Sequence, residues 1–139
     1  MKRQPITNPV DKKYIIEAEQ ELGIVFPDSF KAKMEKENGG GLVADNDDWN
    51  LFPFFDKSDR KRISRTCNHI ILETKRMKEE WRNFPNDGIA IASNGSGDFL
   101  ILLPEKEGSK IFRNEIYAWY HEIGTPEKVA NSIDELNDE

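Results

Sequence analysis

The side chains with the greatest intrinsic reactivity are Cys67, His69 and His121, the one cysteine and the two histidines of this 139-residue chain. Cys67 and His69 lie two positions apart in a segment predicted to be helical, and that spacing turns the two side chains toward nearly opposite faces. They therefore cannot pair directly as a catalytic thiol and imidazole. Cys67 falls on the apolar face and is expected in the core. His69 is expected on the surface, and His121, without an identifiable nucleophile, in a structural role.

The densest acidic cluster contains Asp45, Asp47 and Asp48. A calcium loop that started at Asp45 would lack its central glycine and would have Asp56 where a bidentate glutamate belongs. The spacing therefore excludes an EF-hand loop. Two interpretations remain, a solvated acidic turn and a patch that binds a partner. The adjacent Trp49 is either an exposed anchor of that patch or a core residue.

Two glycine-rich segments lack the residues of known catalytic or nucleotide-binding motifs. The run that begins with Gly39 and Gly40 is not followed by the Lys-Ser or Lys-Thr of a phosphate loop, and the run that ends in Gly97 has neither dinucleotide nor nucleophile spacing. We interpret the first run as a helix stop and the second as a turn. Asp98 is expected to accept backbone hydrogen bonds within that turn, because no paired titratable group favours general-base catalysis.

Charge is unevenly distributed along the chain. The net charge is -6, yet residues 57–82 contain nine basic and four acidic side chains, a local sum of +5. Overall acidity opposes binding to phosphate backbones and suits a basic protein partner. The basic island could contact RNA, with Trp49 or Phe52 as a stacking surface, but no nucleic-acid motif supports that. A charged outer helix face is the preferred interpretation.

Composition favours one folded cytoplasmic domain. Apolar residues make up 37% and charged residues 33% of a chain whose length suits one domain. A lone cysteine can form no intrachain disulfide, as is typical of a reducing compartment. The basic start leads into no apolar run, and no stretch approaches the ~20 apolar residues of a membrane span. Neither export nor membrane insertion is expected.

Apolar spacing predicts four helices. Asn8 and Pro9 supply the N-cap and first position of a helix that Gly23 ends, and Pro27 starts a second helix that stops at the first glycine run. From Ser58 onward, apolar residues through Trp81 share one face across about six turns and predict the longest helix. The cap-like Thr125-Pro126-Glu127 and the stripe Val129–Leu136 predict a closing helix.

Strands are predicted at Leu42–Val43, Trp49–Phe54, Ile89–Ala92, Phe99–Leu103, Ser109–Arg113 and Ile116–His121. The third and fourth are apolar at successive positions, so they are expected at the centre of the sheet with helices over at least one face. Short connections favour antiparallel pairing. The sequence predicts an α+β fold, a single domain over residues 1–139 with its core at 8–136. Its mostly antiparallel sheet packs with an N-terminal helical hairpin, a long central helix and a C-terminal helix.

The segment Glu21–Phe30, followed by Glu37–Gly40, resembles the opening of the SUKH superfamily, also called the Smi/Knr-like domain. Trp49–Pro53, Ile89–Asp98 and Ile116–Glu122 agree with that superfamily in order. The resemblance covers nearly the whole chain, roughly from Val10 to Leu136. Phe26 stands where leucine is frequent, which preserves an apolar side chain.

This resemblance implies an α+β fold without an agreed catalytic set. For small bacterial members it implies immunity proteins that neutralise polymorphic toxins, often nucleases, whereas eukaryotic relatives are regulatory or scaffold modules. Gly39, Gly40, Trp49, Gly97 and Asp98 carry over as structural positions only.

We therefore expect an immunity protein rather than an enzyme. It would bind a cognate toxin, a basic nuclease domain, through Asp45, Asp47, Asp48 and Trp49 and would occlude the toxin's active or substrate-binding surface. The alternative is an intracellular regulatory scaffold. Neither a metal, a cofactor, direct nucleic-acid binding nor a membrane is expected, and a cytoplasmic monomer is favoured. The sequence does not identify the toxin.

Overall fold

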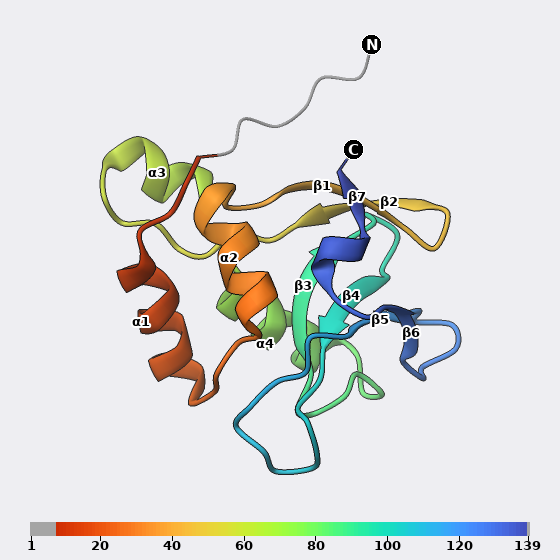
Figure 1. Ribbon diagram of the computed structural model, residues 1–139. Helices are drawn as coiled ribbons and strands as arrows, with labels where there is room; N and C mark the ends of the chain where they lie inside the picture. Colours follow the sequence, from red (N-terminus) through yellow and green to blue (C-terminus); the bar gives the residue numbers. More distant parts are fainter. Residues whose placement is uncertain (1–7, 139) are drawn as a thin grey trace.

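The helices of the N-terminal half and the strands of the sheet lie on opposite sides of the molecule. The computed structural model describes residues 8–138, and Figure 1 shows α1 and α2 on the left and the strands on the right. The basic start of the chain falls outside the described residues. Within residues 8–138, no helix is both long and apolar enough to cross a membrane.

Helix α1, Lys12–Leu22, begins later than predicted. Its N-cap is Asp11, whose carboxylate accepts the backbone N–H of Lys13 at 3.0 Å. The carbonyl of Asn8 instead accepts the backbone N–H of Asn38 at 2.9 Å, so Asn8 joins the chain start to the end of α2. Gly23 ends α1 as predicted, in a left-handed conformation with φ of 70°.

Helix α2, Asp28–Lys36, turns its apolar face inward against α1 and the sheet. Phe26, Phe30 and Phe54 form a buried aromatic cluster with ring centroids 5.2–5.9 Å apart. Burying each ring stabilises the fold by roughly 1.5–3 kcal/mol. Phe26 therefore keeps the apolar role expected of it, between the two helices.

The strands form one antiparallel sheet in the order β6-β5-β4-β3-β2-β1-β7. Their bounds are β1 Gly40–Ala44, β2 Asp47–Leu51, β3 Ile89–Ser93, β4 Phe99–Leu102, β5 Ile116–Trp119, β6 Glu127–Ala130 and β7 Asn137–Asp138. The α+β class, the antiparallel pairing and the central place of β3 and β4 are confirmed. Ser109–Arg113, predicted as a strand, contributes only isolated bridges, to Val25 and Pro104.

Both faces of the central strands are buried, which explains their continuous apolar sequence. In β4, Leu100 and Leu102 belong to the apolar cluster that includes α1 and α2. Phe99 and Ile101, on the opposite face, pack in a second cluster with Met77 of α4. Helices thus cover the central strands on both faces. These strands therefore lack the alternation of polar and apolar residues that marks a half-exposed strand.

The predicted long central helix is wrong, because the segment forms two shorter helices. Helix α3 spans Arg60–Arg65 and α4 spans Ile70–Glu80. Between them, the hydroxyl of Thr66 donates to the carbonyl of Arg62 at 2.7 Å, and His69 caps α4. Cys67 lies in this connection and is exposed, which corrects its predicted place in the core.

The predicted C-terminal helix is also wrong. Glu127–Ala130 forms β6, which pairs with β5, and only a short 3-10 helix, η1 (Ile133–Glu135), precedes β7. The hydroxyl of Ser132 accepts the backbone N–H of Asp134 at 3.3 Å and starts η1. Ile133 is buried, so part of the expected apolar stripe does enter the core, but from a turn.

Candidate functional site

The three aspartates of the acidic cluster sit on a tight hairpin turn. Ala44 pairs with Asp47, so Asp45 and Asn46 form a two-residue loop, and both have positive φ, 48° and 60°. This is the geometry of a type I′ turn, which Asp and Asn tolerate better than other side chains that carry a Cβ. The turn leaves Asp45, Asp47 and Asp48 exposed at the end of the β1–β2 hairpin.

The β3–β4 loop meets this turn through one amide side chain. Asn94 Nδ2 donates to Asp47 Oδ2 and to Asp98 Oδ2, both at 3.0 Å. Asn94 Oδ1 accepts the backbone N–H groups of Ser96 at 2.9 Å and Asp98 at 3.4 Å. Asn94 therefore provides the turn contacts that the sequence assigned to Asp98.

Asp98 instead links the loop to His121, two residues after the end of β5. Its Oδ1 accepts the backbone N–H of His121 at 3.1 Å and lies 2.8 Å from His121 Nδ1. The Trp81 ring packs against the imidazole, with centroids 5.1 Å apart. Gly97 has φ of 89°, and a Cβ there would meet His121 Nδ1 at 3.2 Å, so the turn fits closely against the ring.

Burial and hydrogen bonds together set the protonation states of Asp98 and Tyr120. Burial alone would raise the pKa of Asp98, but hydrogen bonds from Asn94 and His121 and the charge of His121 lower that pKa overall. Tyr120 donates its hydroxyl to Asp45, and its pKa is raised, by burial first and by Asp45 second. At neutral pH Asp98 is therefore an anion and Tyr120 a neutral donor.

Three segments distant in sequence thus meet in one place. We call this the acidic turn surface, and its members come from the β1–β2 turn, the β3–β4 loop and the residues after β5: Asp45, Asp47, Asp48, Asn94, Asp98, Tyr120 and His121. The hydrogen bonds orient the carboxylates of Asp45, Asp47 and Asp98 before any partner arrives, which lowers the ordering cost of binding.

Trp49 does not belong to the acidic turn surface as an exposed anchor. Its side chain is fully buried, and its Nε1–H donates to the carbonyl of Ala44 at 2.9 Å. One ring edge contacts Tyr120, with centroids 6.3 Å apart. This corrects the partner-binding hypothesis for Trp49 and leaves the packing role that the resemblance implies.

The first two glycines of the first glycine run adopt positive φ where the chain passes from α2 into β1. Helix α2 ends at Lys36, and Gly39 and Gly40 follow with φ of 116° and 97° as the chain enters β1. Asn94, Tyr120 and His121 also belong to the surface, and the sequence did not predict them there. An Asn followed by Gly is a turn signal that could have revealed Asn94. Tyr120 lies 75 positions from Asp45, and no local pattern reveals that contact.

The His121–Asp98 pair contains the same residue types, in hydrogen-bond contact, as the histidine and aspartate of a hydrolase triad. Within residues 8–138, however, no hydroxyl or thiol side chain hydrogen-bonds to His121, and Cys67 lies in the α3–α4 connection. Nor does the described part of the chain contain a cluster of three side chains suited to hold a metal ion.

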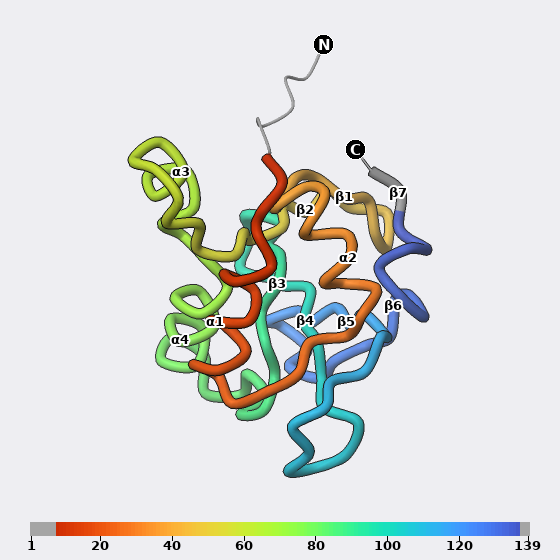
Figure 2. Tube along the Cα trace, turned by 60° about the vertical axis from the view of Figure 1, so that its left-hand side comes forward, coloured from red at the N-terminus to blue at the C-terminus, as the bar shows by residue number. Residues whose placement is uncertain are grey.

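A second charged feature is α3, which carries part of the basic island. It contributes no buried side chain, and Figure 2 shows it at the periphery of the molecule. Arg62 lies near Asp56 and Asp59, whereas Arg60, Lys61 and Arg65 have no ion pair within the described part of the chain.

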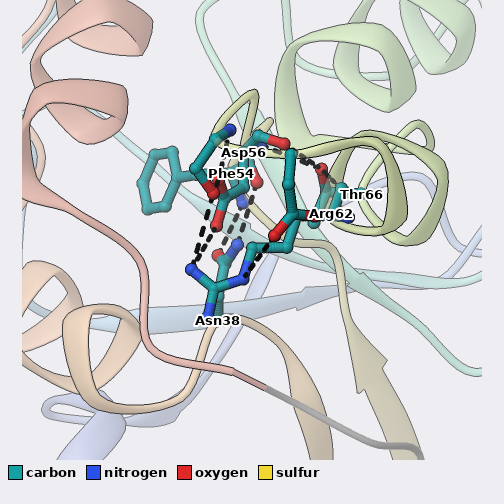
Figure 3. Close-up of polar contacts among 7 residues, drawn as sticks. Asn38, Phe54, Asp56, Arg62 and Thr66 are labelled. Atoms are coloured by element: carbon teal, nitrogen blue, oxygen red, sulfur yellow. Dashed lines mark hydrogen bonds and ion pairs between the residues drawn. The ribbon is translucent and has the colours of Figure 1, made fainter.

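Buried polar contacts hold α3 to the rest of the molecule (Figure 3). Asp56, only 2% exposed, accepts the N–H and the hydroxyl of Ser58 at 3.0 and 2.6 Å and lies 3.6 Å from Arg62. Its own N–H donates to Thr66 Oγ1 at 2.9 Å. Asn38 fixes the segment before Asp56. Its Nδ2 donates to the carbonyl of Phe54 at 2.9 Å, and its Oδ1 accepts the N–H of Phe54 at 2.8 Å.

Comparison with known proteins places this fold in a family. The profile of the SMI1 / KNR4 family (SUKH-1) matches residues 9–139, which is nearly the whole chain. The chain belongs to the SMI1 / KNR4 family. This confirms the resemblance to the SUKH superfamily that the Glu21–Phe30 segment carries. Searches among curated proteins and among solved structures found no match to this SUKH-1 protein.

Proposed function

We propose that this SUKH-1 protein is an immunity protein that binds a cognate toxin through the acidic turn surface. Membership of the family is compatible with that role. The observation that carries the proposal is the convergence of three carboxylates, those of Asp45, Asp47 and Asp98, which hydrogen bonds hold in place near the exposed Asp48. A fixed negative surface complements a positive one and speeds encounter with it.

The partner chemistry follows from this charge. Nucleases present basic grooves to their phosphate substrates, so a basic nuclease domain is the toxin that the acidic turn surface fits best. Carboxylates placed over that groove would occupy the positions of substrate phosphates and block access to the active site. In this proposal the protein acts as a single-domain cytoplasmic monomer without catalytic activity or a cofactor.

The test is protection of cells from the toxin. A toxin encoded beside this gene would be expressed in cells with and without the protein, and growth would be followed. We expect growth only with the protein, and co-purification of the two chains. Growth arrest in the presence of a folded, expressed protein would contradict the immunity role.

A regulatory scaffold is the second candidate, and α3 is the observation that favours it. Helix α3 is basic and has no buried side chain, and it is separate from the acidic turn surface. The molecule therefore has two exposed faces of opposite charge. Such a protein could bridge two partners. Recovery of a stable ternary complex that needs both faces, without toxin protection, would favour this alternative.

A further inference from the structure

An open cavity of about 290 Å³ lies between α1, the segment before α3 and the start of α4. None of its lining residues belongs to the acidic turn surface. A volume of this size is at the low end for ligand pockets and suits one long side chain or a small molecule of similar size. The cavity is therefore a separate feature that the proposed function does not use.

The floor of the cavity is apolar. Ala18, Phe54 and Ile70 line it and are at most 5% exposed. One wall is a stacked pair, Phe55 and His69, whose ring centroids lie 4.8 Å apart with an angle of 19° between the planes. These groups offer an aliphatic chain a surface on which to pack, and an aromatic face near its end.

The rim carries unequal charge. Glu17 and Glu21 lie one helical turn apart on α1 and both line the cavity. Lys57 Nζ lies 3.4 Å from Glu17 Oε1, whereas Glu21 has no ion pair within the described part of the chain. His69 is the other titratable group of the rim. Its Nδ1 accepts the backbone N–H of Leu72 and therefore carries no proton. Of the two rim carboxylates, that of Glu21 is thus the one without an ion-pair partner among the described residues.

Lys57 shows how a cation fits here. Its ammonium group lies 5.9 Å from the centre of the Phe55 ring while it contacts Glu17. An ammonium or guanidinium between a carboxylate and an aromatic ring gains from both the charge and the ring quadrupole. The chain's own lysine supplies one such cation, and Glu21 can pair with a second.

We propose that this cavity binds one alkylammonium or guanidinium group with an aliphatic stem, the chemistry shared by a lysine or arginine side chain of a partner and by a small free cation. The stem packs on Ala18 and Phe54, and the charged end pairs with Glu21. Lys57 occupies Glu17, so the incoming cation can use only one of the two rim carboxylates, and in this sense the two cations compete.

The test is an NMR titration of the full chain with butylguanidinium, and with butylurea as an uncharged probe of similar shape. We expect butylguanidinium to shift the backbone amides of Glu21, Phe55 and Lys57, with an affinity on the order of millimolar, as suits so small a ligand. Butylurea should shift these amides far less. Equal shifts from both probes, or none from either, would overturn the proposal.

Substitutions at the rim give effects of opposite sign. Glu21→Gln should weaken butylguanidinium binding by about two- to fivefold, the usual range for an exposed ion pair. Lys57→Met keeps the aliphatic stem, removes the competing cation, and should tighten binding by a similar factor. Glu79→Gln, an exposed glutamate farther along α4, is the matched control and should change nothing. Weaker binding in Lys57→Met would contradict the proposed competition.

A peptide titration separates the two sources of the cation. The probe is an acetylated pentapeptide with one arginine between glycines, compared with its citrulline analogue. If the arginine peptide binds and the citrulline peptide does not, the ligand is a side chain of a partner. If butylguanidinium binds but the arginine peptide does not, the ligand is a small free cation. These titrations need no toxin, so the cavity and the immunity role can fail separately.

Discussion

His69 shows how one side chain couples an ionisation state to a helix. Its Nδ1 is the N-cap acceptor of α4, 3.3 Å from the backbone nitrogen of Leu72, and its ring stacks on Phe55. Burial lowers the pKa of His69, Glu21 opposes that shift, and Lys75 adds to it. A protonated Nδ1 cannot accept a hydrogen bond, so the cap requires neutral imidazole.

We predict that the free energy of unfolding decreases as the pH falls below about 6.5, the usual pKa of histidine. The folded-state pKa of His69 is lower than the unfolded one, so the unfolded chain binds more protons in this window. This contribution is fully present above the unfolded pKa and is lost as the pH falls through the folded one. Urea unfolding at a series of pH values measures it.

His69→Asn is the matched control for this pH dependence, because asparagine caps a helix without titrating near neutral pH. The variant should flatten the dependence between about pH 6.5 and pH 5, while the titration of Asp98, whose pKa is lowered from 3.8, stays below that window. An unchanged slope in His69→Asn would contradict the role given to His69.

Single residues were predictable where the signal is local. The turn at Asp45 and the helix stop at Gly23 follow from residue types that favour those backbone conformations. Trp49 carried no such signal, because an aromatic residue suits both a core and an interface. The contact between Tyr120 and Asp45 depends on strand pairing across the sheet, which a local pattern cannot specify.

At the scale of elements, the break between α3 and α4 has two causes. The residues there are weak helix formers, and they hydrogen-bond to an earlier segment of the chain. Residues 66–69 read Thr-Cys-Asn-His, four consecutive types with modest helix propensity. Thr66 is also drawn into hydrogen bonds with Asp56 and Arg62, and the N–H of Ile70 donates to Pro53 at 3.0 Å. Apolar spacing alone predicted one helix because it continues through the break.

The C-terminal segment was misread for a related reason. Val129, Ala130, Ile133 and Leu136 match helical spacing, but a short strand followed by a turn places the same residues toward the core. Pairing of β6 with β5 outweighs the local capping signal at Thr125. Short apolar runs are ambiguous between helix and strand, and tertiary pairing decides.

We predict that Asp56→Ala detaches α3 and also destabilises the whole fold. The substitution removes the buried carboxylate that accepts two hydrogen bonds from Ser58 and lies beside Arg62, at a cost of roughly 1–3 kcal/mol. Amide hydrogen exchange over residues 58–66 should become much faster, and urea unfolding should show lower stability. Unchanged exchange in α3 would contradict the role given to this network.

Asp59→Ala is the control for Asp56→Ala. Asp59 is the N-cap of α3 and accepts the backbone N–H of Arg62 at 2.8 Å, but it is exposed. Because α3 buries no side chain, loss of this cap should speed exchange within α3 with little change in global stability. Similar global losses in both variants would mean that α3 itself, and not Asp56, supports the fold.

At the scale of the whole molecule, charge is separated into faces that the linear sequence only partly revealed. The sequence sums located a basic segment within an acidic chain, and the fold places its most exposed part on α3. The fold also brings Asp98 to the three aspartates of the hairpin turn through Asn94. The acidic turn surface is therefore a product of topology. It gathers more carboxylates in one place than any one of its segments supplies.

We predict that the acidic turn surface accelerates association with a basic toxin. Asp45→Asn, Asp47→Asn and Asp48→Asn together remove three charges but keep side-chain oxygens that can accept hydrogen bonds, such as the one from Tyr120. Stopped-flow measurements at low salt should show association slowed by up to about tenfold, with a smaller effect on dissociation. The salt dependence of the association rate should weaken in parallel.

The control set is Asp87→Asn, Glu105→Gln and Glu107→Gln, which changes the net charge by the same amount at exposed positions around the loop after β4. The two sets are compared at physiological salt, where screening limits long-range attraction to about 8–10 Å and the position of each charge therefore matters. The control should therefore slow association much less than the hairpin set. Equal slowing by both sets would mean that net charge alone guides the encounter, and unchanged rates in the folded hairpin variant would place the toxin on another face.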